Sequence, residues 1–450
     1  MSTDFKEVSE NYTLAEAIHE AQRCLNCKVP GCKKGCPISN DIPDWIHELS
    51  MGNFGNAMKI IHNRSNLPAV CGRVCGHERQ CEGSCALGKK GEVIHIGKLE
   101  RFLADFDSEA GWTHESIPDL HRGRVAVIGS GPAGLTIAGD LARQGFSVEI
   151  FEMEREAGGV LQYGIPEYRL PKEVVRREIK KIENLGVIFH LNTTAGVDFT
   201  VDDLFAQGFD AIFIGTGTGV PKRLDIPGGN HKGVKQAIRF LRKVSLYENG
   251  HITRDEVSVQ PEDKVGVIGC GNTAMDAART AIRMGASEVY VIYHRTIDRM
   301  AALRAEYDEA VKEGVKFLWN TSVSEVIADP VANRLTSVKL ETKTEAEDGS
   351  QSVQVSEIPL DRLYLAVGSA PAARIVSTTA GINVDDKGYV LTRDLPYGMT
   401  TRRGVFAGGD VTNRPATVVH AMRDAKLVAE GIAKYIDAVK LMESINLNDE

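Results

Sequence analysis

The chain has 450 residues, of which 42% are hydrophobic and 25% charged, and its formal net charge is −8. This composition is typical of a soluble globular protein, and the length suits two or three domains. The negative charge argues against a nucleic-acid-binding protein, the lack of an apolar run of ~20 residues against a membrane protein, and the polar start against a signal peptide. We therefore expect a cytoplasmic protein whose thiols stay reduced.

The first 100 residues are rich in cysteine. Thr13-Leu-Ala-Glu16 has the pattern of a capping box and predicts a helix that runs towards Arg23. Eight of the nine cysteines follow in two runs, with a helical stretch from Trp45 to Arg64 between them. The runs are Cys24, Cys27, Cys32 and Cys36, which precedes Pro37, and then Cys71, Cys75, Cys81 and Cys85.

These cysteines could form disulfides, bind structural zinc or hold iron–sulfur clusters. A reducing compartment disfavours disulfides, and structural zinc usually takes paired C-x₂-C knuckles. Closely spaced thiolates with a proline after the last cysteine favour iron–sulfur clusters, so we favour two [4Fe–4S] clusters and keep zinc as the alternative. In two-cluster ferredoxins the fourth cysteine of a run serves the other cluster, and we therefore do not assign one run to one cluster.

The segment from Asp105 to Arg122 is polar and irregular, and we interpret it as a linker. A dinucleotide-binding fingerprint follows it, with a buried strand Val125–Ile128, glycines at G-x-G-x-x-G spacing and a helix to Arg143. A second strand, Ser147–Phe151, ends at Glu152, which is placed to accept hydrogen bonds from a ribose diol. The three glycines are Gly129 for the tight turn, Gly131 for approach of a pyrophosphate and Gly134 for helix packing.

Glycine and proline recur after this fingerprint, from Gly158 to Pro166 and at Arg169-Leu-Pro171. Such a stretch suits backbone packed against a flat ligand, and the alternative is an ordinary surface loop. A helix over 172–185 and a strand over 187–191 come next, and the strand that starts at Ala211 returns to the same sheet.

A second fingerprint begins at Lys264 and has Gly269, Gly271 and Ala274 at the glycine positions. The following strand, Val289–Tyr293, ends in His294-Arg295 rather than in an acid. An arginine at this place attracts a 2′-phosphate, which favours NADP over NAD, and the alternative is a solvated arginine at a strand end.

The rest of the chain is expected to add two strands and a helix. We expect a strand at Tyr364, a strand from Gly404 that ends at Gly408-Gly409-Asp410, and an amphipathic helix from Thr417 to about Val439. We expect the residues from Met442 to Glu450 to be frayed.

The two fingerprints, the cysteine runs, the stretch Gly159–Pro171 and the stretch Gly404–Asp410 together resemble the small subunit of NADPH-dependent glutamate synthase over nearly the whole chain. Related modules are the N-terminal half of dihydropyrimidine dehydrogenase and the large subunit of NADH-dependent ferredoxin:NADP oxidoreductase. The resemblance implies an α/β fold in which an α-helical iron–sulfur head precedes two Rossmann-like nucleotide-binding domains, one inserted in the other. The implied domains are a head with two [4Fe–4S] clusters at 1–122, an FAD domain at 123–229 and 366–450, and an NADPH domain at 230–365.

The resemblance also implies site residues. For FAD these are Gly129, Gly131, Pro132, Ala133, Gly134, Glu152, Gly159, Val160, Leu161, Gly164, Ile165, Arg169, Thr216, Gly217, Gly409, Asp410, Thr417 and Val418. For NADPH they are Gly269, Gly271, Asn272, Thr273, Ala274, His294 and Arg295. The cluster ligands are Cys24, Cys27, Cys32, Cys36, Cys75, Cys81 and Cys85, with Glu100 or Cys71 as the eighth.

The chemistry of the implied cofactors agrees with this interpretation. Nicotinamide gives up two electrons as hydride and an iron–sulfur cluster takes one at a time, while a flavin can do both. A disulfide reductase needs a cysteine pair facing the flavin, but outside the head only Cys270 remains.

We therefore expect an oxidoreductase that passes electrons from NADPH to a partner, the glutamate synthase large subunit. The alternatives are an electron-input subunit of a dihydropyrimidine dehydrogenase or of an electron-bifurcating ferredoxin:NADP oxidoreductase, and a zinc-stabilised nucleotide-binding protein. The identity of the partner cannot be read from this chain.

Overall fold

The computed structural model describes residues 4–111, 119, 121–345, 351–372, 374–413 and 417–446. Part of the expected linker, at 112–118 and 120, lies outside this description. The chain divides into two compact units. The smaller unit contains Met1–Glu7, Tyr163–Tyr168 and Pro221–Ser369, and the larger unit contains Val8–Gln162, Arg169–Val220 and Ala370–Glu450.

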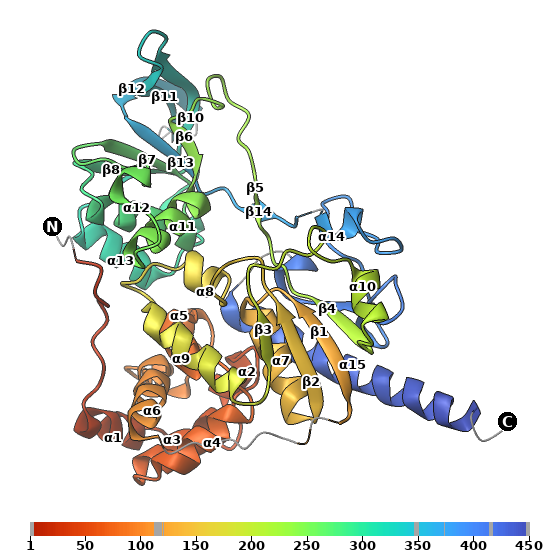
Figure 1. The fold of residues 1–450 in the computed structure, drawn as a ribbon. Helices are drawn as coiled ribbons and strands as arrows, with labels where there is room; N and C mark the ends of the chain where they lie inside the picture. The colour runs from red at the N-terminus through yellow and green to blue at the C-terminus, as the bar shows by residue number, and fades with distance from the viewer. Residues whose placement is uncertain are drawn as a thin grey trace. The chain divides into compact units, whose positions relative to one another are not determined.

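The larger unit begins with a helical head (Figure 1). Thr13 caps the first helix through the expected capping box with Glu16. The helical stretch expected between the cysteine runs consists of two helices, and Gly52 takes a left-handed φ of 79° in the turn that separates them. The elements are α1 Leu14–Gln22, α2 Gly31–Gly35, α3 Ile42–Ser50, α4 Phe54–His62, α5 Pro68–Val74, η1 His77–Arg79, η2 Ala86–Lys89 and α6 Ile96–Ala110.

The core of the head forms where these helices meet. Trp45, Leu49, Met58 and Leu99 come from α3, α4 and α6 and are fully buried. Four cysteines, among them Cys24 and Cys85, pack at the edge of this core. The head is therefore a packed helical body with cysteines at its margin.

A seven-stranded sheet follows the head, in the order β15-β16-β17-β4-β1-β2-β3. The strands from β17 to β3 are parallel, whereas β15 and β16 pair antiparallel at one edge. The strands are β1 Gly123–Ile128, β2 Phe146–Phe151, β3 Ile188–His190, β4 Ala211–Ile214, β15 Thr392–Asp394, β16 Tyr397–Thr400 and β17 Val405–Ala407.

Helices from distant parts of the chain cover this sheet. The C-terminal helix α15 lies along α7 (Figure 1), where Lys426 pairs with Asp140 at 2.8 Å. The expectation of a frayed end from Met442 was wrong as far as Asn446, since α15 continues to that residue, and 447–450 lie outside the described residues. The helices are α7 Pro132–Arg143, α8 Val160–Tyr163, α9 Lys172–Glu183, α10 Val201–Ala206, α14 Arg374–Ser377, η5 Gly409–Val411 and α15 Val418–Asn446.

The smaller unit is built on a five-stranded parallel sheet in the order β6-β13-β7-β8-β9. Its strands are β6 Val234–Gln236, β7 Lys264–Ile268, β8 Glu288–Ile292, β9 Lys316–Leu318 and β13 Arg362–Leu365. Its helices are α11 Ala237–Glu248, η3 Arg254–Glu256, α12 Asn272–Arg283, η4 Ile297–Arg299 and α13 Arg304–Lys312.

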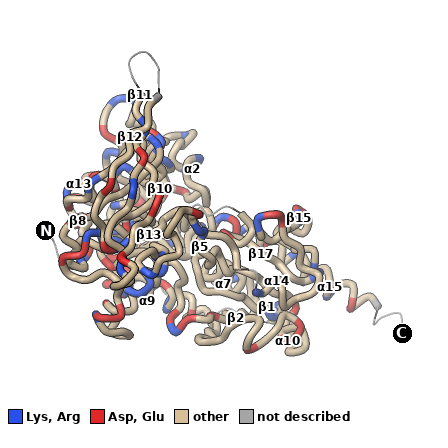
Figure 2. The backbone as a smooth tube through the Cα atoms, turned by 90° about the horizontal axis from the view of Figure 1, so that it is seen from above, with Lys and Arg blue, Asp and Glu red and all other residues tan. Residues whose placement is uncertain are grey.

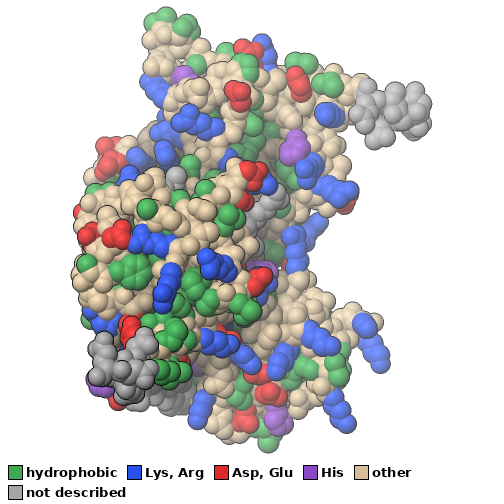
Figure 3. Space-filling view, turned by 90° about the vertical axis from the view of Figure 1, so that its right-hand side faces the viewer, with side chains coloured by type: hydrophobic (Ala, Val, Ile, Leu, Met, Phe, Trp, Pro, Cys, Tyr) green, Lys and Arg blue, Asp and Glu red, His purple; other side chains and the backbone are tan. Residues whose placement is uncertain are grey.

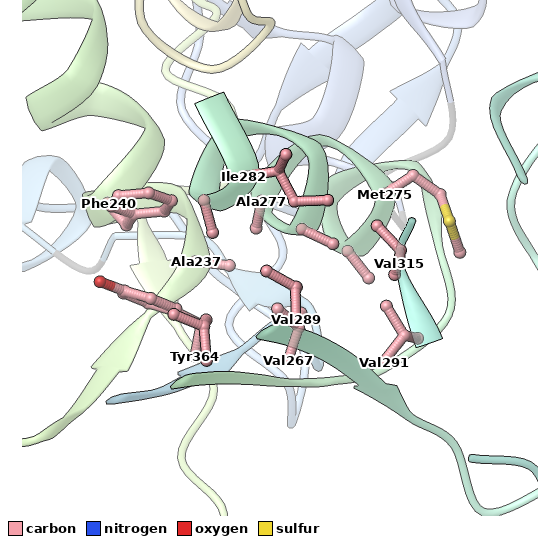
Figure 4. Close-up of a cluster of buried hydrophobic side chains, with 14 of the residues drawn as sticks. Ala237, Phe240, Val267, Met275, Ala277, Ile282, Val289, Val291, Val315 and Tyr364 are labelled. Atoms are coloured by element: carbon pink, nitrogen blue, oxygen red, sulfur yellow. The ribbon is translucent and has the colours of Figure 1, made fainter. Parts of the chain in front are cut away.

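Figure 4 shows the core of this unit, in which α12 lies over the sheet. Ala277 faces Val267 and Val289, and the rings of Phe240 and Tyr364 stack with centroids 4.4 Å apart. An antiparallel sheet of β10 Thr321–Asp329, β11 Arg334–Glu345 and β12 Gln351–Pro359 is attached, and the short strands β5 Val220–Pro221 and β14 Ser369–Ala370 pair with each other.

A buried charge network fastens α12 to α13 in the smaller unit. The Arg279 guanidinium contacts Glu313 at 2.8 Å and Glu306 at 2.7 Å, and Arg283 contacts Glu313 at 2.6 Å. Burial alone would raise the pKa of Glu313, but the two guanidinium groups lower it below its usual value. The network thus contributes stability above the ordinary carboxyl pKa and loses it as the pH falls through the lowered one.

We predict that Glu313→Gln lowers the free energy of unfolding of this unit by about 3 kcal/mol, because it leaves two buried guanidinium groups with one carboxylate fewer. Glu309→Gln, on the same helix, breaks only a surface pair with Lys312 and should cost less than about 0.5 kcal/mol. Urea unfolding of both variants measures the difference, and equal stabilities would contradict the network's role.

Candidate functional site

The first glycine turn joins β1 to α7 in the larger unit. A Cβ on Gly129 (φ 98°) would lie 2.8 Å from the Gly215 carbonyl oxygen, and a Cβ on Gly134 would overlap the Gly129 carbonyl oxygen. A Cβ on Gly131, the N-cap of α7, would meet no atom within 4 Å. The fold itself thus requires Gly129 and Gly134, whereas Gly131 leaves open space before the N-terminus of a buried helix, where an anionic group is favoured.

Glu152 is held beside this turn. It is 5% exposed. Its carboxylate accepts hydrogen bonds from the Ser130 backbone N–H at 2.9 Å, from Ser130 Oγ at 2.6 Å and from the Glu154 N–H at 2.8 Å. Ser130 therefore positions the Glu152 carboxylate. The sequence analysis did not single out Ser130, although its place between Gly129 and Gly131 of the fingerprint could have indicated a role.

The glycine-rich stretch after Glu152 packs on the same turn. A Cβ on Gly159 (φ 54°) would lie 2.9 Å from the Gly131 Cα. The ammonium group of Lys172 is buried and donates to the carbonyls of Leu161 at 2.9 Å and Leu170 at 3.1 Å, so it holds the two ends of the stretch together.

The other expected residues of this stretch differ in position. Leu161 is buried, Arg169 is 9% exposed and Val160 is 44% exposed. Gly164 and Ile165 belong to the segment 163–168, which is part of the smaller unit.

Two later segments return to the first glycine turn. A Cβ on Gly409 (φ 76°) would lie 3.0 Å from the Cβ of Ala133, next to Pro132 in the first turn of α7. Thr216 and Gly217 follow β4, and the Thr216 Cα would be 3.4 Å from a Cβ on Gly129.

The last expected residues flank the start of α15. Asp410 lies in η5, directly after Gly409. Thr417 Oγ1 lies 2.7 Å from His420 Nδ1, and Val418 opens α15.

The second glycine turn lies in the smaller unit. A Cβ on Gly269 (φ 120°) would lie 2.5 Å from the Ala366 carbonyl oxygen, whereas one on Gly271, the N-cap of α12, would meet nothing within 4 Å. Asn272 Oδ1 accepts from the Leu303 N–H at 2.9 Å. Ala274 is buried, while Thr273 next to it is exposed. The turn repeats the open space at the middle glycine.

Two expected side chains follow β8 in this unit. Both His294 and Arg295 are exposed. The His294 ring lies against Tyr293, with centroids 5.1 Å apart. Within the described residues the Arg295 guanidinium has no ion-pair partner, so the cation is available to an anionic ligand.

Four cysteines line one pocket of the head. Cys24, Cys27 and Cys32 come from the first run and Cys85 from the end of the second. The apolar side chains of Leu25, Ile42, Ile46, Leu87, Ile94 and Ile96 complete the wall. We call this the first cysteine pocket.

A second pocket combines the remaining members of the runs. Cys36 of the first run meets Cys75 and Cys81 of the second, with Cys71 and Glu100 in the same wall. The Cys71 sulfur lies 3.6 Å from the Met422 sulfur of α15 and 3.9 Å from Ser65 Oγ. In this second cysteine pocket, as in the first, the fourth cysteine of a run joins the other run.

Burial disfavours the charged form of several ligand candidates in the two pockets. Burial raises the pKa of the Cys32 and Cys36 thiols to about 11. Burial, with the carboxylate of Glu178, raises the pKa of Glu100 to about 8. Metal binding must therefore release protons here.

The donor sets suit an iron–sulfur cluster. Such a cluster is held by thiolates, and the cysteines of each pocket line the wall of one cavity.

Sequence reasoning missed His77 in the second cysteine pocket. Its Nε2 is buried and without a hydrogen-bond partner, and its ring occupies the space that a side chain on Gly97 would fill. Burial lowers the pKa of His77 to about 4, so the ring is neutral. The sequence could have indicated this position, since His77 follows Cys75 by two residues.

Cys270 is the one cysteine outside the head. It is buried in the second glycine turn, where its backbone carbonyl accepts from the N–H groups of Ala301 and Ala302. No disulfide forms among the described cysteines. The other eight cysteines lie between residues 24 and 85, so Cys270 has no second cysteine outside the head with which to form a redox pair.

Comparison with protein families gives two matches. Residues 1–112 match a family described as dihydropyrimidine dehydrogenase domain II, 4Fe-4S cluster. Residues 123–425 match a family described as pyridine nucleotide-disulphide oxidoreductase. The expected fold class, a helical iron–sulfur head before α/β nucleotide-binding domains, is confirmed.

Individual proteins resemble the chain over nearly its full length. The glutamate synthase [NADPH] small chain of Halomonas elongata is 36% identical, and the match covers 96% of this chain and 93% of that protein. The protein of the same name from Escherichia coli K12 is 34% identical, with 96% and 94% covered. The crystal structure of Lactococcus lactis thioredoxin reductase in the FR conformation has a TM-score of 0.52 and 25% identity, covering 70% of this chain and 99% of that one.

In the part of the chain that the structure describes, no helix is long and apolar enough to cross a membrane.

The open space at Gly131 gives a test of the first glycine turn. We predict that Gly131→Ala folds, since its Cβ meets no protein atom, but is purified largely without flavin absorbance, because the methyl group occupies the approach to the helix N-terminus. Absorbance spectra and thermal unfolding measure both properties. Gly134→Ala is the contrasting variant, because its Cβ clashes with backbone and should lower stability; full FAD occupancy in the stable Gly131→Ala protein would contradict the assignment.

Proposed function

Because the chain belongs to the glutamate synthase small-chain family, we propose that it oxidises NADPH and passes the electrons through FAD and two [4Fe–4S] clusters to the large catalytic chain of glutamate synthase. It is an NAD(P)H-dependent FAD and iron–sulfur oxidoreductase of the small-chain type. When bound, the flavin accepts two electrons as hydride and can release them singly. No side chain of the protein is assigned as a general acid or base.

The observation that carries the proposal is the position of the second cysteine pocket. Val419, in the first turn of α15, forms part of its wall, and Met422 touches Cys71. The residues directly before Val419, Thr417 and Val418, are those that we assign to the flavin side of this helix. One short stretch of α15 thus belongs to both sites, which supports electron transfer between them.

The ligand assignment follows the two pockets. We assign Cys24, Cys27, Cys32 and Cys85 to one cluster, and Cys36, Cys75 and Cys81 to the other. Glu100 or Cys71 completes the second set, and both lie in its wall. The crossed grouping is the arrangement known from two-cluster ferredoxins.

The domain assignments are those that the sequence analysis gave. We propose an FAD domain at 123–229 and 366–450, an NADPH domain at 230–365 and a cluster-binding head at 1–122. Support for the two nucleotide sites comes from the open space before Gly131 and before Gly271. Support for NADPH comes from the unpaired guanidinium of Arg295 at the end of β8.

Coenzyme choice is tested at Arg295. Arg295→Glu replaces attraction to a 2′-phosphate by repulsion, and a charge-assisted contact is worth roughly 1.5–3 kcal/mol. We expect kcat/KM for NADPH to fall about tenfold or more while that for NADH changes little. The control is Arg299→Glu, an exposed arginine of the same loop; an equal loss for both coenzymes at Arg295 would show a structural role instead.

The electron path is tested at Cys27, in the first cysteine pocket. With Cys27→Ser we expect NADPH to reduce the flavin and a small dye at the normal rate, while turnover with the large chain falls to near background. Stopped-flow absorbance and steady-state assays separate the two reactions.

Cys75→Ser is the matched variant in the second cysteine pocket and should give the same split. Soluble, flavin-loaded Cys27→Ser protein with full partner turnover would contradict the path. Insoluble or flavin-free protein would instead show that the cluster is needed for folding of the head.

A further inference from the structure

The two loops that line the first cysteine pocket also form an exposed surface. The first loop carries Cys24, Cys27 and Cys32, and the second carries Cys85. The loops are packed tightly together, since a side chain on Gly31 would collide with the Ser84 carbonyl. They therefore present one continuous surface over the pocket.

Apolar side chains stand out from this surface. Leu25 is 60% exposed and Val29 is 70% exposed, and both lie within two residues of a cysteine of the pocket. Single exposed apolar residues are common on proteins, but these two flank the same cysteine, Cys27. An apolar centre of this kind is what a partner buries first.

Four exposed lysines belong to the same two segments as the cysteines of the pocket. Lys28 precedes α2 and Lys34 lies in it, while Lys89 ends η2 and Lys90 follows it. None of the four has an ion-pair partner among the described residues. We call these four residues the lysine rim.

Few acids lie in these two segments. Residues 24–36 and 85–92 carry five lysines and one acid, Glu92. Asp41, outside them, pairs with Lys33 and lies 3.8 Å from Arg64. The rim is thus a local positive surface on a chain whose net charge is −8. Residues of both signs alternate along the backbone (Figure 2), and both occur on the face of the molecule shown in Figure 3.

We propose that Leu25, Val29 and the lysine rim form the docking surface for the electron-accepting partner, and that the partner presents an acidic face there. The proposal rests on the proposed function: because the second cysteine pocket adjoins α15, we take the first cysteine pocket as the exit for electrons. It adds the location of the contact and the charge of the partner. The lysines steer the encounter and the apolar pair supplies the buried centre.

The position of the surface agrees with the demands of electron transfer. The second cysteine pocket contains the buried Cys71 and Cys81 and is closed on one side by α15. The first pocket is covered mainly by the half-exposed loops themselves. A protein that takes electrons one at a time must therefore approach over these loops.

The test uses the full-length holoprotein reduced by NADPH and two protein acceptors of opposite charge, an acidic plant-type ferredoxin and the basic cytochrome c. The second-order rate constant of acceptor reduction is measured between about 0.05 and 0.5 M salt, where the Debye length falls from ~14 Å to ~4 Å. Binding of oxidised ferredoxin is measured separately by calorimetry. We expect the rate with ferredoxin to fall about tenfold or more with salt, and the rate with cytochrome c to rise.

The rim variant combines Lys28→Glu, Lys34→Glu, Lys89→Glu and Lys90→Glu. In this variant the rate with ferredoxin should rise with salt and the rate with cytochrome c should fall, and ferredoxin binding should be abolished. The control replaces four exposed, unpaired lysines elsewhere, Lys59, Lys232, Lys387 and Lys434, by Glu. A control that behaves as the rim variant does, or a rim variant with unchanged salt dependence, would overturn the proposal.

Two readouts separate this test from the proposed function. Flavin reduction by NADPH and reduction of a small neutral dye should be normal in both multiple variants. If the wild-type protein catalysed neither flavin reduction by NADPH nor dye reduction, the proposed function itself would be contradicted. Leu25→Ser with Val29→Ser should weaken ferredoxin binding without changing its salt dependence; an unchanged affinity would remove the apolar pair from the docking surface.

Discussion

The arrangement of the head depends on the exchange of one cysteine between the two runs. Cys85 of the second run lies with Cys24, Cys27 and Cys32, and Cys36 of the first run lies in the second cysteine pocket. Each pocket therefore needs both loops of the head in place. Because the pockets share these loops, metal bound in one would also order the walls of the other.

The same exchange determines what lies on either side of the pockets. With Cys36, Cys75 and Cys81 gathered at the buried end of the head, their pocket meets the first turns of α15 at Val419 and Met422. The other pocket is left under exposed loops with Leu25 and Val29. The second cysteine pocket thus adjoins the helix that covers the seven-stranded sheet, and the first lies under exposed loops, which supports the direction of the proposed electron path.

Much of this could be predicted from local sequence. The fingerprints at Gly129 and Gly269 predict a strand, a turn and a helix in succession, and the structure has these elements at both places. The capping box at Thr13 placed the first helix correctly. Short-range constraints of this kind act whatever the rest of the chain does.

Long-range features could not be predicted in the same way. The grouping of Cys85 with the first run depends on packing between loops more than 50 residues apart, and Gly31 against Ser84 is not a pattern in the sequence. The antiparallel sheet of β10, β11 and β12 was missed, and the length of α15 was underestimated because its last turns are stabilised by contacts such as Lys440 with the Arg122 carbonyl.

The central claim is that both cysteine pockets hold [4Fe–4S] clusters in a chain that also binds FAD. The most direct measurement is the content of iron, acid-labile sulfide, zinc and FAD in protein purified without oxygen. The account predicts about eight iron atoms and about eight sulfides with one FAD per chain and no zinc. Zinc in place of iron and sulfide, or iron without FAD, would contradict it.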